Sequence, residues 1–69
     1  MTNTTLLEEL IAKSGLKKKF LADSLGITTT ALTTKIRNIR EFKASEIEIL
    51  CNHLGVSSLE DRQRIFFAK

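Results

Sequence analysis

Apolar residues recur along this chain at spacings of three and four, which is the period of amphipathic helices. The clearest stripes consist of Leu7, Leu10 and Ile11, and of Ile47, Leu50, Cys51 and Leu54. Gly15, Gly26 and Gly55 each follow such a stretch, where a left-handed residue commonly ends a helix. The pattern predicts an all-α bundle of about five short helices. We expect them over 6–13, 17–24, from 28 or 29 to the loop at 37, from 44 or 45 to 54, and over 59–64.

Serine and threonine residues ahead of these stretches are candidate helix caps. Three pairs have the spacing of a capping box, namely Thr5 with Glu8, Ser45 with Glu48, and Ser57 with Glu60. Either Thr28 or Thr29 is expected to cap the third helix. The sequence therefore predicts where each helix begins as well as where it ends.

Composition limits the chain to a single small domain over residues 1–69. Hydrophobic residues make up 42% and charged residues 28%, and Trp, Tyr and Pro do not occur. A core of this size is marginal, so each apolar position matters for stability. The single cysteine cannot form an internal disulfide, and no stretch resembles a signal peptide or a membrane span. These features favour a cytoplasmic protein without a membrane partner.

The positive charge is concentrated in one part of the chain. The net charge is +3, yet residues 13–43 hold eight Lys and Arg against two acidic residues, while both flanking parts are net acidic. A basic block of this kind predicts binding to a polyanion such as nucleic acid. The alternative is that these side chains only solvate a surface.

The segment from Lys17 to Asn38 has the most specific pattern. Two helical stretches meet at Gly26, as in a helix-turn-helix. The outer face of the second stretch carries only polar residues, which are Thr29, Thr30, Thr33, Thr34, Lys35 and Arg37. Threonine is a poor helix former, so helix stability does not account for this choice. Its hydroxyl and methyl groups do suit the base edges in the major groove of DNA.

The remaining apolar positions predict the core and an additional contact. Phe20, Leu21 and Leu25 are expected to face inward from the second helix, and Ala31, Leu32 and Ile36 from the third. The end of the chain, over 58–69, is too apolar for a free tail. Its residues Ile65, Phe66 and Phe67 are expected to dock on the bundle or to bury themselves against a second subunit as a dimerisation segment.

Residues 16–56 resemble the Cro/repressor-type helix-turn-helix family, whose fold is lambda-repressor-like. The resemblance rests on Ala22, Gly26 and Leu32, on the segments LADSLGI and EFKASEI, on a KI pair late in the third helix and on the ending IFFA. Cro-like repressors of phages and prophages look most similar. Two positions depart from the family pattern. Lys18 stands where Gln is common, and Lys35 stands where an aliphatic residue is usual, so that Ile36 takes over the inward role.

The resemblance implies a DNA-binding repressor that reads bases with its third helix and acts at the nucleoid of a bacterial host cell. The corresponding base-reading candidates are Thr29, Thr30, Thr33 and Thr34. Lysines at a helix N-terminus oppose the helix dipole unless an anion lies nearby, and a DNA phosphate would supply that anion. We expect phosphate contacts from Lys17, Lys18, Thr28, Lys35, Arg37, Asn38, Arg40 and Lys43. One helix covers few base pairs, so the expected partner is a pseudo-palindromic operator bound by a homodimer.

Other functions have less support in the sequence. A protein-interaction module, acting as an anti-repressor, modulator or antitoxin on a repressor or toxin partner, would keep the fold but does not require a basic third helix. RNA binding lacks an aromatic stacking platform. The sequence holds no phosphate-binding glycine loop and no nucleophile–base pattern, so neither an enzyme nor a cofactor is expected. Cys51 is expected in the core and His53 on the surface, without a metal site.

Overall fold

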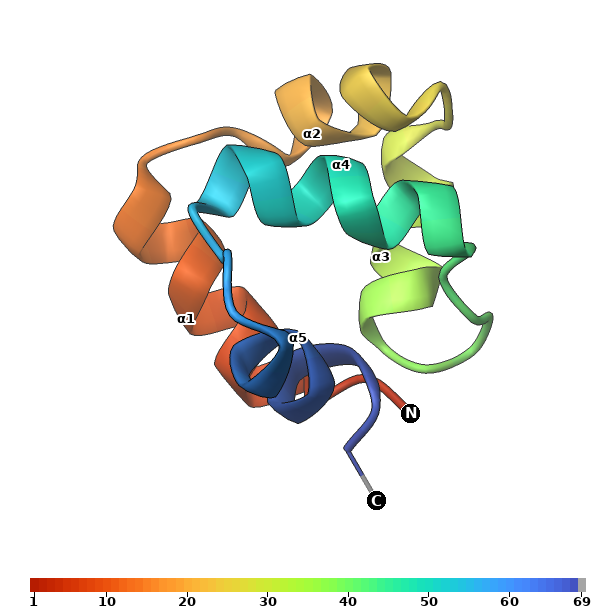
Figure 1. Cartoon of the computed structure of the whole chain (residues 1–69). Coiled ribbons are helices and arrows are strands. Elements are labelled where there is room, and N and C mark those ends of the chain that lie inside the picture. Colours follow the sequence, from red (N-terminus) through yellow and green to blue (C-terminus); the bar gives the residue numbers. More distant parts are fainter. Residues whose placement is uncertain (69) are drawn as a thin grey trace.

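Five α-helices make up the computed structural model, which describes residues 1–68 (Figure 1). They are α1 (Thr4–Ser14), α2 (Lys18–Leu25), α3 (Thr29–Ile36), α4 (Ala44–Leu54) and α5 (Leu59–Phe66). In Figure 1, α4 runs across the middle of the view, α2 lies along it, and α5 lies beside α1 at the opposite side. The predicted all-α bundle is confirmed. No helix among the 68 described residues is long and apolar enough to cross a membrane.

The helix starts differ from the predicted capping boxes by one or two residues. Asn3 caps α1, because its Oδ1 accepts a hydrogen bond from the Leu6 N–H at 3.1 Å. Ser58, rather than Ser57, caps α5 by accepting from the Asp61 N–H at 3.1 Å. Thr28 is the cap of α3, one of the two residues expected there, and accepts from the Ala31 N–H at 3.0 Å. Neighbouring polar residues compete for one cap position, and spacing alone did not select between them.

The start of α4 is stabilised by an acidic side chain within the helix. The Lys43 N–H donates a hydrogen bond to Glu46 Oε1 at 2.8 Å, so the box predicted from Ser45 and Glu48 is wrong. Glu46 also brings negative charge to the positive end of the helix dipole. The residue therefore satisfies one of the free N–H groups of α4 and stabilises its first turn.

The core consists mainly of residues predicted from the apolar stripes. Leu7, Leu21, Leu32, Leu50 and Cys51 are all nearly inaccessible to solvent. Phe20 is an exception, since it is 47% exposed and contacts the His53 ring edge-on at a centroid distance of 5.1 Å. The prediction that Phe20 faces the core is therefore wrong. Its neighbour Leu21, which was also predicted to face inward, is buried.

The C-terminal segment docks on its own chain. Ile65 and Phe66 are buried, and Phe66 packs edge-on against Phe42 at a centroid distance of 5.5 Å. These contacts extend α5 beyond the predicted end at residue 64. A second subunit is thus not needed to bury Ile65 and Phe66, which was the reason for expecting them at a dimer contact, and their role in dimerisation stays a prediction. Phe67 is 59% exposed and is the member of the trio that remains available to a partner.

Lys35 is buried, contrary to the expectation that it faces solvent. Its residue surface is 7% exposed, and its Nζ lies 2.6 Å from both carboxylate oxygens of Glu46. Burial by itself raises the pKa of Glu46, but hydrogen bonds from Lys35 and from the Lys43 N–H, with the charges of both lysines, outweigh it and lower that pKa. The carboxylate therefore stays charged at neutral pH, and the pair joins α3 to the first turn of α4.

We predict that Lys35→Met or Glu46→Leu alone destabilises the fold by about 3–5 kcal/mol, because each leaves one charge buried without a partner. The double variant should recover most of that loss, since two apolar side chains can fill the same space. Chemical denaturation of the four proteins measures the coupling between the two positions.

The exposed pair Lys19 and Asp23, whose charged atoms are 3.7 Å apart, provides the control. Alanine substitutions at these two positions should show a coupling below about 1 kcal/mol. A Lys35→Met protein as stable as the unmodified chain would contradict the structural role assigned to the buried pair.

Candidate nucleic-acid interface

The turn between α2 and α3 sets the orientation of the third helix. Gly26 adopts a φ of 71°, a left-handed conformation that glycine reaches without steric cost. The Ile27 N–H then donates to the Ala22 carbonyl at 3.0 Å, and Thr28 begins the capped start of α3. The two helices are joined by only three residues and pack directly on one another. This is the geometry of a helix-turn-helix.

The buried side of α3 determines which residues face outward. Leu32, Lys35 and Ile36 are buried, so the opposite side of the helix lies at the surface. Thr29 and Thr30 are exposed there, and Thr33 and Thr34 are half-buried. The structure therefore places all four base-reading candidates on α3 outside its core contacts.

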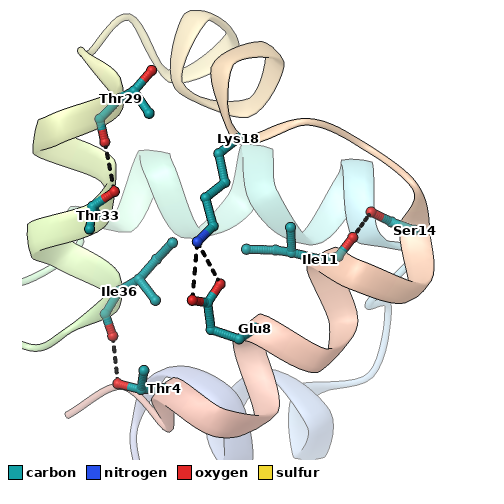
Figure 2. Close-up of polar contacts among 8 residues, drawn as sticks. All are labelled: Thr4, Glu8, Ile11, Ser14, Lys18, Thr29, Thr33 and Ile36. Atoms are coloured by element: carbon teal, nitrogen blue, oxygen red, sulfur yellow. Dashed lines mark hydrogen bonds and ion pairs between the residues drawn. The ribbon is translucent and has the colours of Figure 1, made fainter.

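The four threonines do not have the same hydrogen-bonding state. Thr33 Oγ1 donates to the Thr29 carbonyl at 3.0 Å, as Figure 2 shows, and Thr34 Oγ1 donates to the Ala31 carbonyl at 2.8 Å. Thr29 and Thr30 lie in the first turn, and within residues 1–68 their hydroxyls make no such bond. Thr28 Oγ1 accepts from the Ala31 N–H and keeps its proton for another partner.

The lysines at the start of α2 differ in their partners. Lys17 is exposed and forms no ion pair within the described part of the chain. Lys18 instead extends to Glu8 on α1, with its Nζ 3.0 Å from one carboxylate oxygen, in the space between α1 and α3 (Figure 2). No local sequence signal links Glu8 to this site, because it lies ten positions before Lys18 on another helix. An ammonium group held by Glu8 attracts an anion less than the free one of Lys17.

Cationic residues also gather beyond the C-terminus of α3. Arg37, Arg40 and Lys43 are exposed, and none takes part in an ion pair among residues 1–68. The Thr34 carbonyl accepts from the Ile39 N–H at 2.9 Å and from the Arg40 N–H at 3.3 Å, which holds the start of this loop against the helix. Free positive charge therefore flanks the outward face of α3 from the start of α2 to the α3–α4 loop.

Asn38 has a structural role that the sequence analysis did not anticipate. Its φ is 65°, a left-handed conformation that asparagine tolerates better than most residues. Its Oδ1 accepts from the Thr2 N–H and its Nδ2 donates to the Thr2 carbonyl, both at 2.7 Å, while a longer bond of 3.3 Å reaches Thr4 Oγ1. All hydrogens of the amide thus have partners inside the chain, and Asn38 is not free to donate to a phosphate.

The two residues after Thr2 make further contacts, one with the end of α3 and one with α5. Thr4 Oγ1 donates to the Ile36 carbonyl at 2.6 Å, as drawn in Figure 2, and the Asn3 N–H donates to the Ile65 carbonyl at 2.6 Å. We call residues 2–4 the N-terminal clamp. The clamp satisfies a free carbonyl at the end of α3 and fixes that end relative to α5.

Together, α2, its turn and the exposed face of α3 define a helix-turn-helix domain. A scan against models of protein families matches residues 6–61 to the Cro/C1-type HTH DNA-binding domain. The chain belongs to this family and is a DNA-binding domain of the kind found in transcription regulators. Searches of curated proteins and of solved structures found no match. No cluster of three or more His, Cys, Asp or Glu side chains within residues 1–68 is arranged to hold a metal ion.

We predict that glycine and alanine rank in opposite order of stability as replacements for Asn38 and for Asn52. Asn38→Gly should lower the free energy of unfolding by about 1–2 kcal/mol, because it removes the amide bonds to the clamp. Asn38→Ala should lower it by about 1 kcal/mol more, since alanine also resists the left-handed conformation. Urea denaturation measures both values.

Asn52, exposed within α4, is the matched control. There alanine should be the more stable substitution by about 1 kcal/mol, because glycine weakens a helix interior. If alanine were equal to or better than glycine at position 38, the conformation assigned to Asn38 would be wrong.

Proposed function

We propose that this protein is a sequence-specific transcription regulator of the phage or prophage Cro-like repressor type, with α3 lying in the major groove of DNA. The observation that carries the proposal is the exposed threonine face of α3, flanked by cations without acidic partners among the described residues. A surface with this charge attracts DNA of any sequence, and polar side chains on the helix then contact base edges. Action on DNA inside a bacterial cell, at the nucleoid, follows from this role.

The phosphate contacts of the proposal come from residues that keep a free hydrogen-bond donor. These are Lys17, Thr28, Arg37, Arg40 and Lys43. Lys18 joins them by sharing its ammonium group between Glu8 and a phosphate. Lys35 and Asn38 leave the set, because Glu46 and the N-terminal clamp occupy their polar groups.

Two copies of the domain are proposed to bind a pseudo-palindromic operator, since one helix contacts only a few base pairs. Phe67 is the proposed dimer contact. It is exposed, and it lines a shallow groove together with Leu6 and Arg64. An exposed aromatic side chain beside a second apolar residue is a typical anchor of a small interface.

Selection of bound duplexes from a random pool tests the DNA-binding proposal. We expect an enriched inverted repeat, and a logarithmic plot of affinity against salt with a slope of about −0.9 for each phosphate neutralised. The Arg40→Gln, Lys43→Gln double variant should make that slope shallower by about 1.8 for each protein chain bound.

The control for charge is Lys13→Gln in the last turn of α1, an exposed position that is not among the proposed phosphate or dimer contacts. This variant should keep the slope of the unmodified protein. No enrichment and a flat salt response would contradict the proposal and favour the alternative of a protein-interaction module acting on a repressor or toxin.

Substitution of Phe67 tests the proposed dimer contact. Phe67→Asp should leave the thermal unfolding temperature nearly unchanged, because the side chain is already exposed. It should, however, weaken binding to a two-half-site duplex much more than binding to a single half-site. Gel-shift titrations of both duplexes measure the difference. Equal losses on the two duplexes, or none, would exclude Phe67 as the dimer contact.

A further inference from the structure

The hydroxyl groups of Thr33 and Thr34 already donate their protons within α3. A threonine hydroxyl has one proton to donate and two lone pairs that accept. In both residues the proton is engaged with a carbonyl of the preceding turn, at 3.0 Å for Thr33 and 2.8 Å for Thr34. What each side chain offers outward is therefore a hydrogen-bond acceptor and a methyl group, without a donor.

The remaining residues of the α3 surface do not share this restriction. Thr29 and Thr30 lie in the first turn, where no preceding helical carbonyl is available to their hydroxyls, so both can donate. Arg37, at the opposite end of the helix, is a donor in every state. Donors are thus located at the two ends of the reading face, and its middle consists of acceptors and methyl groups.

The major groove distinguishes base pairs by these same groups. Adenine exposes an amino donor and thymine a methyl group, while guanine exposes two acceptors and cytosine an amino donor without a methyl group. In an A·T pair an acceptor can therefore meet the adenine amino group while a methyl group packs on the thymine methyl, whereas a G·C pair offers only the cytosine amino group. Facing guanine, an acceptor-and-methyl surface would place two acceptors together, which costs free energy because neither can donate.

From this geometry we infer that Thr33 and Thr34 make the protein prefer A·T over G·C pairs at the centre of each half-site and disfavour guanine as the base that they face. Guanine is favoured opposite the ends of α3, where Thr29, Thr30 or Arg37 can donate. The inference rests on the proposed placement of α3 in the major groove, and it adds the class of DNA sequence that the helix prefers.

Base analogues in the enriched duplex test the inference. Replacing a central thymine by uracil removes the methyl group and should lower affinity about fourfold. Replacing a central adenine by purine removes the amino donor and should lower it about fivefold. Inosine·cytosine pairs resemble G·C in the major groove but A·T in the minor groove, so they should bind as weakly as G·C.

Two variants assign the effects to the threonines. Thr33→Val with Thr34→Val keeps the methyl groups and should abolish the sensitivity to purine, while sensitivity to uracil remains. Thr33→Ser with Thr34→Ser should show the reverse. Thr5→Val, at an exposed position on α1, is the control and should respond to both analogues like the unmodified protein.

The outcomes separate this inference from the proposed function. Steep salt dependence with a guanine-containing central sequence, or inosine·cytosine pairs that bind like A·T, would overturn the inference and leave DNA binding intact. Valine variants with unchanged sensitivity to purine would overturn it as well. Absence of any salt-dependent DNA binding would contradict both.

Discussion

The buried ammonium group of Lys35 imposes a constraint on the rest of the fold. A charge placed among apolar side chains needs a partner at close range, and Glu46 supplies one from the first turn of α4. Since Glu46 also accepts the Lys43 N–H, a shift of α3 along α4 would break the ion pair and the cap together. The pair also fixes the rotation of α3 about its own axis. With Lys35 inward, the threonine face points away from the bundle.

Most of the secondary structure could be predicted from the sequence because local chemistry decides it. The apolar stripes specify the core faces of α1 and α4, and Gly26 allows the sharp turn between α2 and α3. The caps were harder to predict. Asn3 and Ser58 compete with adjacent threonine and serine residues, and only the path of the preceding chain decides which side chain reaches the free N–H groups.

The parts of the site that could not be predicted depend on contacts between distant residues. A lysine on a helix is normally exposed, and no local signal relates Lys35 to a glutamate eleven positions later. The contact between Asn38 and Thr2 spans thirty-six positions, and no local sequence signal indicates it either. The Lys35–Glu46 pair removes a cation from the surface, and the Asn38 contact removes a hydrogen-bond donor. The basic block of the sequence contains paired and unpaired cations, and only the structure separates Lys17 and Arg40 from Lys18 and Lys35.

The N-terminal clamp makes the two ends of the chain interdependent. Asn3 bonds to the Ile65 carbonyl, while Thr2 and Thr4 hold Asn38 and the end of α3. The family match spans 6–61, so it includes neither the clamp nor the buried Ile65 and Phe66. A protein shortened to residues 6–61 would lack the buried Ile65 and Phe66, and it would also lack the hydrogen bonds that hold the end of α3. The contacts that complete this fold therefore extend beyond the motif by which the family is recognised.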